Sequence, residues 1–122
     1  MRQLVENSPQ AFASIPAVTS VGVAAGLVLI SNSKRKGFLI QNTGTTIIKL
    51  AFGSASSAPT QTVYHIALKD CAAANDGSGG VYVDDAWTGD VWAISSAGGG
   101  TCVICEFKTG SPDWNAAMDW GV

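Results

Sequence analysis

The sequence predicts an all-β fold, a single antiparallel β-sandwich of the jelly-roll or immunoglobulin type. From Val23 onward, short runs of β-branched and aromatic residues recur along the chain, with Gly, Ser, Asn and Asp between them. The chain has 122 residues, of which 47% are hydrophobic, and this is enough to bury one substantial core. No segment requires a helix longer than one or two turns.

Residues 1–22 are predicted to form an extended N-terminal arm. Pro9 and Pro16 interrupt this segment, and neither a helical nor a strand period is sustained in it. The sandwich domain is expected over residues 23–109.

A short C-terminal tail is expected over residues 110–122. It begins with Gly, Ser and Pro, which end the preceding strand. The tail carries Trp114 and Trp120, whose large rings are costly to leave in water. Both tryptophans are therefore predicted to be protein contacts, either on this sandwich or on a neighbouring chain.

The strands of the predicted sandwich are bounded by turn residues. The Gly-rich segments 77–80 and 98–100 lack both the strand-loop-helix context and the lysine of a phosphate-binding loop, so we interpret them as turns. The expected strands are Leu27–Ser31, Gly37–Asn42, Thr46–Phe52, Gln61–Leu68, Gly80–Asp84, Asp90–Ser95 and Thr101–Lys108.

The most distinct element is a β-hairpin predicted over residues 36–53. Apolar residues alternate on both sides of a turn at residues 42–45, where Gly44 is expected to supply the positive φ that such a loop needs. The edge or outer face of this hairpin is predicted to contact other proteins. The candidate contact residues are Gln41, Ile47 and Lys49.

The charge pattern argues against nucleic acid as a partner. The net charge is −2, and the basic residues cluster only at residues 34–36, so no dense field for phosphates is expected. Charged residues make up 13% of the chain, about half the usual share. A surface of small neutral residues suits a protein that is buried in an assembly.

Neither a membrane span nor a signal peptide is expected. The apolar segment 11–30 is interrupted by Pro16, by Ser and Thr residues and by two glycines, and Glu6 and Pro9 are atypical of a signal peptide. Three cysteines, an odd number, do not form a disulfide framework. We therefore expect synthesis in a reducing cytoplasm.

Cys102 and Cys105 have the CxxC spacing of zinc and redox sites. The segment around them is a predicted strand, in which positions three apart point to opposite faces, so the two thiols are not expected to share an ion. Further ligands would have to come from Cys71 and His65. Two structural thiols and no metal site are therefore predicted.

No catalytic residue is predicted. His65 lies in a probable strand, without a nucleophile elbow or a second histidine. Asp84 and Asp85 are adjacent, and neighbouring strand residues face opposite ways. Calcium binding by these two with Asp76 and Asp90 is an alternative, but turn formation at strand ends is favoured. No cofactor is expected.

An aromatic platform for carbohydrate is a further alternative. Its candidates are Tyr82, Trp87 and Trp92. Aromatic residues on strands are more often part of the core, and we favour that interpretation.

Four segments together resemble the small structural proteins of tailed-bacteriophage virions. In these proteins a basic residue opens a strand ending in Asn, an xFG motif follows, and a Gly-x-(Tyr/Trp)-Ala-Ile strand precedes a last strand that ends in an acidic residue. The matching segments are RKGFLIQNTG at 35–44, IIKLAFG at 47–53, GDVWAI at 89–94 and CVICEF at 102–107. The resemblance spans residues 34–107. Residues 62–68 depart from it, since they are more polar and contain His65.

The resemblance implies a non-enzymatic head decoration, cement or fibre-base protein, usually trimeric. We therefore expect a protein of the virion surface that binds the major capsid protein and further copies of itself, and that stabilises contacts between capsomers. An extended arm, an aromatic tail and low charge suit contacts over large areas with identical neighbours. The alternatives are a head-fibre base, a tail or connector component, and a glycan- or receptor-binding module.

Overall fold

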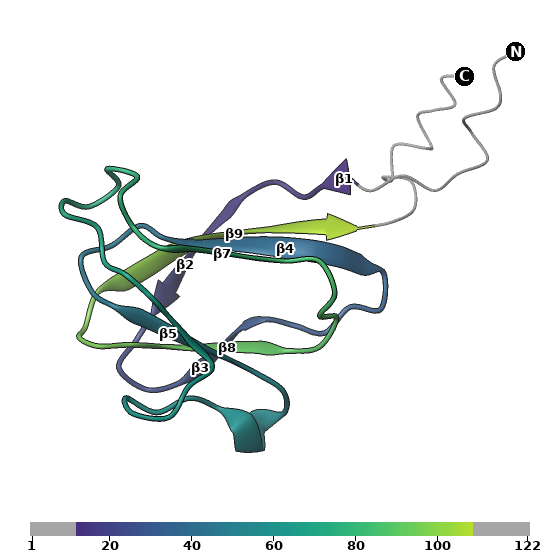
Figure 1. Cartoon of the computed structure of the whole chain (residues 1–122), viewed down its shortest axis with the longest axis horizontal. Helices are drawn as coiled ribbons and strands as arrows, with labels where there is room; N and C mark the ends of the chain where they lie inside the picture. The colour runs from purple at the N-terminus through teal and green to yellow at the C-terminus, as the bar shows by residue number, and fades with distance from the viewer. Residues whose placement is uncertain (1–11, 109–122) are drawn as a thin grey trace, which may run out of the picture.

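The computed structural model describes residues 12–108 and confirms an all-β sandwich of two antiparallel sheets (Figure 1). Sheet A has five strands and sheet B has four. Sheet A contains β1 (Phe12–Ala13), β2 (Ala17–Val21), β4 (Arg35–Asn42), β7 (Val81–Asp84) and β9 (Gly100–Lys108). Sheet B contains β3 (Gly26–Leu29), β5 (Ile48–Phe52), β6 (Ile66–Leu68) and β8 (Val91–Ser95). A one-turn 3₁₀ helix, η2 (Ala55–Ser57), follows β5.

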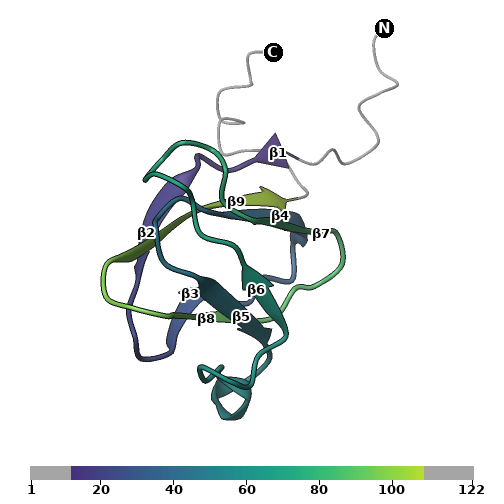
Figure 2. The same ribbon diagram turned by 60° about the vertical axis from the view of Figure 1, so that its left-hand side comes forward.

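The strand order is that of a jelly roll. In sheet A, β9 lies between β2 and β4, and β7 lies on the other side of β4; in sheet B the order is β3-β8-β5-β6 (Figure 2). Strand β5 pairs with β6, β4 with β7, β3 with β8 and β2 with β9. This is the pairing of one long ribbon, doubled between β5 and β6 and then rolled into two sheets, which distinguishes the jelly roll from the immunoglobulin alternative.

The core lies between the sheets and takes one side of every long strand. Phe38 and Ile40 of β4 face Ile48 and Leu50 of β5 across it, and all four are fully buried. The other buried members are Val21, Leu68, Val91, Ala93, Cys102 and Ile104. The described residues contain no helix with the length and hydropathy needed to span a bilayer.

The prediction of a β-hairpin over residues 36–53 is wrong. Strand β4 pairs with β9 and β7 in sheet A, whereas β5 pairs with β8 and β6 in sheet B. The alternation that predicted both strands is real, but alternation identifies the buried side of a strand and not its partner. The connection between them crosses from one sheet to the other.

The side chain of Asn42 stabilises this connection between β4 and β5, where a hairpin turn was expected. Its fully buried side chain donates from Nδ2 to the carbonyl oxygens of Thr46 (2.7 Å) and Leu68 (3.1 Å). Its Oδ1 accepts the Gly44 N–H at 3.0 Å. Gly44 does not have the expected positive φ. A Cβ there would lie 3.2 Å from the backbone nitrogen of Thr101, so close approach explains the glycine better than φ does.

Arg35 closes the other end of β4. Its side chain is fully buried, and its Nε donates to Glu106 Oε2 at 2.9 Å. The two Nη atoms donate to the carbonyl oxygens of Trp87, Gly89 and Ile30, which belong to two different connections. A single guanidinium therefore satisfies backbone groups that no sheet ladder reaches.

The expected boundary between arm and sandwich at residue 22 differs from the structure. Within the described part of the arm, β1 and β2 pair antiparallel with β9, from Phe12 opposite Lys108 to Val21 opposite Gly100. Residues 12–21 therefore belong to sheet A. Only Val21 of β2 is buried, so this edge strand has no apolar alternation to reveal it. Residues 1–11 and 109–122, with Trp114 and Trp120, lie outside the described residues.

The strand predicted over residues 61–68 is shorter than expected. Thr60 Oγ1 accepts the backbone N–H of Val63 at 2.9 Å, and the Thr60 N–H donates to the Val63 carbonyl oxygen at 2.8 Å. These bonds form a turn, so the strand β6 begins only at Ile66.

We predict that Asn42→Ala lowers the free energy of unfolding by about 2–4 kcal/mol, because three buried backbone groups lose their partner. Urea denaturation followed by circular dichroism measures this change. Gln41→Ala, the outward-facing neighbour in the same strand, is the control and is expected to change stability by less than about 1 kcal/mol. Equal losses in the two variants would contradict the role assigned to Asn42.

We predict that Arg35→Met costs about 3–5 kcal/mol, because it removes the donor of three carbonyl groups and leaves Glu106 with Lys108 alone, whose Nζ lies 3.6 Å away. Lys36→Met removes the same charge from an exposed position and is expected to have little effect. Thermal and urea unfolding of both variants provide the comparison. A stable Arg35→Met protein would refute the importance of this cluster.

Candidate functional site

The three candidate contact residues do not form one surface. Gln41 is on the outer side of sheet A, where its Nε2 lies 3.4 Å from the Gly77 carbonyl oxygen. Lys49 is on the outer side of sheet B, and Ile47 is 39% exposed in the connection that precedes β5. Because β4 and β5 belong to opposite sheets, Gln41 and Lys49 point away from each other.

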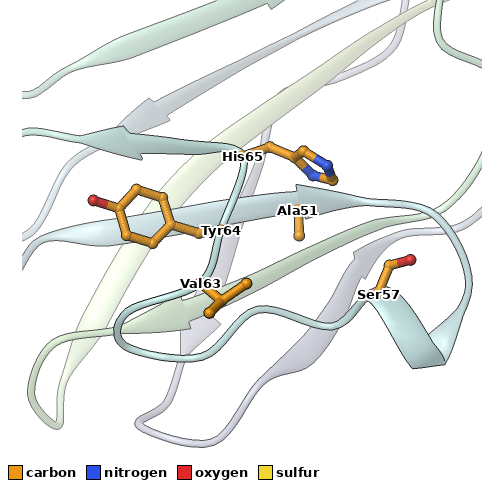
Figure 3. A pocket seen from close by; sticks show the side chains of 5 residues that line it. All are labelled: Ala51, Ser57, Val63, Tyr64 and His65. Atoms are coloured by element: carbon orange, nitrogen blue, oxygen red, sulfur yellow. The ribbon is translucent and has the colours of Figure 1, made fainter.

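A hollow of about 230 Å³ opens on the outer side of sheet B. Figure 3 shows Ala51 on β5 as its floor, with Ser57 of η2 on one side and His65 on another. Val63 and Tyr64 complete the lining. We call the hollow together with Lys49 the sheet B site.

Gly53 allows the chain to fold back over β5 and form this hollow. Its φ is +136°, and a Cβ there would lie 2.9 Å from Ser57 Oγ. Both facts make a side chain unfavourable at this position. The Gly53 carbonyl oxygen accepts the indole N–H of Trp92 at 2.9 Å, which anchors the fold-back to the sheet.

The exposed side chains of the sheet B site are held in place. Val63 is 68% exposed and Tyr64 is 42% exposed, although both lie in a turn fixed by Thr60. Lys49 Nζ lies 5.1 Å from the centre of the Tyr64 ring, a cation–π contact, and donates to the Gln61 carbonyl oxygen. Sequence reasoning missed Tyr64 because the run around it was taken for a strand.

His65 is oriented by the backbone and by a ring. Its Nδ1 accepts the Phe52 N–H at 3.0 Å, and its ring stacks on the Phe52 ring at 5.4 Å. Nδ1 is therefore an acceptor, and the proton of the neutral ring lies on Nε2. Within residues 12–108, no hydrogen bond joins His65 to Ser57.

The cysteines lie as the strand period predicts. Cys102 is buried in the core, and this burial raises the pKa of its thiol to about 11. Cys105 is on the outer side of sheet A, where its Sγ donates to the Ser14 carbonyl oxygen at 3.2 Å. Cys71 is buried elsewhere, beside Asn42. Within residues 12–108, no three His, Cys, Asp or Glu side chains form a group that could hold a metal ion.

Asp76 shapes a turn. It accepts hydrogen bonds from the hydroxyl and N–H of Ser78 and from the N–H of Ala73. These bonds, chiefly those from Ser78, lower the pKa of Asp76 from 3.8 to about 2.

Asp84 orders the connection after β7. Burial raises its pKa, but hydrogen bonds from the Trp87 N–H, the Tyr82 hydroxyl and the Ala86 N–H outweigh burial and leave the pKa lowered. Burial and the bond to Asp84 raise the pKa of Tyr82 to about 12. Asp90 accepts the Ser31 N–H in a neighbouring connection, so these acidic groups organise turns as expected.

The candidate aromatic platform is not assembled. Tyr82 packs inside the sandwich against Phe52, at a ring distance of 5.4 Å, and Trp87 packs against the same ring at 6.2 Å. The Trp87 indole donates to the Asp90 carbonyl oxygen. Trp92 lies on the outer side of sheet B, opposite Ala51, so the three rings do not share a face.

Comparisons with known proteins show no family. No family model matches the sequence, and no curated protein matches it. One solved structure that matches is from work on Bacillus endospore appendages, which form disulfide-linked pili. It is 14% identical, the match covers 91% of this chain and 98% of that chain, and the TM-score is 0.48. A likeness of this degree carries no argument about function.

We predict that acid loosens the loop around Asp76. The pKa of the folded form lies below the ordinary value, so this carboxylate stabilises the fold above about pH 4, and the contribution is lost as the pH falls towards 2. Melting temperatures between pH 5 and 2 should therefore fall less steeply in Asp76→Asn than in the wild type. Asp85→Asn, an equal change of charge outside this loop, controls for net charge. Identical pH profiles for the wild type and Asp76→Asn would contradict the prediction.

Proposed function

We propose that this chain is a structural protein of a tailed-bacteriophage virion, which binds the outer capsid surface as a decoration or cement protein and stabilises contacts between capsomers. The observation that carries the proposal is the sheet B site, with Val63 and Tyr64 exposed beside an open, mostly apolar hollow. The order of the four sequence segments that resemble such virion proteins supports it. Jelly rolls also occur in viral capsid domains, which is an analogy at the level of fold.

The sheet B site has the properties of a protein contact. Aromatic and aliphatic anchors, desolvated at the centre of a patch, supply most of the binding energy in protein interfaces. The turn at Thr60 and the contact with Lys49 already hold Val63 and Tyr64, so little conformational entropy is lost on binding. Lys49 is placed to act as a polar rim.

The proposed partners are the major capsid protein and further copies of this chain in a homotrimer. With 13% charged residues, the surface offers little electrostatic steering, so binding would rest on shape and apolar contact. Such contacts gain strength when several copies bind one shell at the same time. A head-fibre base, tail or connector component would use the same kind of contact.

A second candidate function is glycan or receptor binding by a virion module. One observation favours it: the exposed Tyr64 ring lies beside the Ser57 hydroxyl and His65 around the hollow. An aromatic face with a few polar groups is suited to a small polar ligand. This function uses Tyr64 rather than the platform of Tyr82, Trp87 and Trp92 that the sequence offered as an alternative.

We predict that the purified protein binds preformed, expanded capsid shells at fixed stoichiometry, and that Tyr64→Ala weakens this binding at least tenfold. Co-sedimentation with shells that lack the protein provides the measurement. Val23→Ala, which trims an exposed side chain in the connection between β2 and β3, is the matched control. The melting temperatures of both variants should equal that of the wild type.

Three results would decide against parts of this proposal. Failure of the wild type to bind shells would overturn the cement function. Shell binding at full strength by Tyr64→Ala would show that the contact with the shell lies outside the sheet B site. Glycan-array binding that is lost in Tyr64→Ala, without shell binding, would favour the second candidate.

A further inference from the structure

The outer side of sheet A is largely apolar, with Gln41 as an interruption. Two rows of cross-strand neighbours form it, because Val18, Val103, Gln41 and Val81 lie in register, as do Cys105, Leu39 and Val83. Val18, Val81 and Val83 are 74%, 49% and 61% exposed. We call this surface the sheet A face and define it by Val18, Leu39, Val81, Val83, Val103 and Cys105.

The sheet A face carries no charged side chain in these two rows. The charged groups of its strands lie elsewhere, since Arg35 pairs with Glu106 at the end of the core and Asp84 binds Tyr82. The polar member of the rows is Gln41, whose amide lies near the Gly77 carbonyl oxygen. Exposed apolar side chains that are grouped in this way, rather than scattered, are suited to a contact.

The size of the sheet A face favours a short segment over a second folded copy. Four strands about 4.8 Å apart and about three residues along each strand give roughly 200 Å². A stable protein interface needs about 800 Å² from each partner. Two tryptophan side chains alone bury roughly 300–500 Å², which is enough to cover the face.

We propose that the C-terminal segment Asp113–Val122 of the same chain covers the sheet A face. Apolar residues occupy every second position of this segment, so in an extended conformation they share one side. These residues are Trp114, Ala116, Met118, Trp120 and Val122. The segment is the right length, because ten extended residues span about 33 Å and the face is only about 20 Å long.

The point at which the chain leaves the sandwich supports this occupant. Residue 109 follows Lys108, the last residue of β9, which lies between β2 and β4 in sheet A. Residues 109–112 are Thr, Gly, Ser and Pro, a composition that favours a reversal of direction. A reversal there would return the segment over its own sheet. The inference does not depend on the proposed function.

Disulfide trapping in the full chain tests the proposal. Cys105 is the half-buried thiol of the sheet A face, whereas Cys71 and Cys102 are buried. In Ala116→Cys, mild oxidation is expected to join Cys105 to the introduced thiol within one chain, as seen by peptide mass mapping and a monomeric band on a non-reducing gel. The control combines Ala116→Cys with Cys105→Ser and Ala67→Cys, which moves the acceptor thiol to an exposed position on the outer side of sheet B. We expect at least tenfold less intrachain disulfide in this control.

The other outcomes overturn the proposal. A covalent dimer through Cys105 would show that the segment lies on a second copy. Equal yields of intrachain disulfide with Cys105 and with Ala67→Cys would show that the C-terminal segment does not bind specifically to the sheet A face. Absence of trapping in Ala116→Cys, together with the second measurement below giving no response, would show that the face has another occupant.

Tryptophan fluorescence gives the second measurement. Val83→Asp places a charge in the sheet A face, which should release Trp114 and Trp120 into water, shift emission to the red and raise acrylamide quenching at least twofold. Val23→Asp makes the same change at a side chain of similar exposure, 58% against 61%, outside the two rows, and should leave emission unchanged. Melting temperatures confirm that both variants are folded. A red shift of equal size in the two variants would contradict the docking.

Discussion

Two buried polar side chains on one strand, Arg35 and Asn42 of β4, close the two ends of the sandwich. A jelly roll sends most of its connections across the ends from one sheet to the other, where backbone groups have no ladder partner. Arg35 supplies donors to the carbonyl groups of Ile30, Trp87 and Gly89 at one end. Asn42 binds Thr46, Leu68 and Gly44 around the other end. Both sheets therefore depend on polar groups at the ends of a strand whose middle is apolar.

The place of the sheet B site follows from the crossing at Asn42. Because β5 enters sheet B, its alternate residues Lys49 and Ala51 face outward on that side. The connection after β5 then folds back through Gly53, covers Ala51 and leaves Tyr64 exposed. Contact residues that are close in the sequence consequently lie on opposite sides of the molecule.

Sequence patterns predicted those features of the fold that depend on residues close together in the sequence. The positions of six of the seven expected strands and the opposite directions of Cys102 and Cys105 follow from apolar runs, turn residues and a period of two, which are local. The partners of β5 come from distant segments of the chain, and no local period reports them. The strand β2 was missed because an edge strand with one buried residue, Val21, has no alternation. The Tyr64 turn was missed because two hydrogen bonds of Thr60 form a turn in a run of residues with high strand propensity.

The pairing of Phe12 with Lys108 has a mechanical consequence. The described chain enters and leaves the sandwich side by side at one end of sheet A (Figure 1). Tension applied between these two points acts along the hydrogen bonds of the β1–β9 pair, which are perpendicular to the strands, and opens them one after another. Each bond then carries the load in turn, so little force is needed to separate β1 from β9.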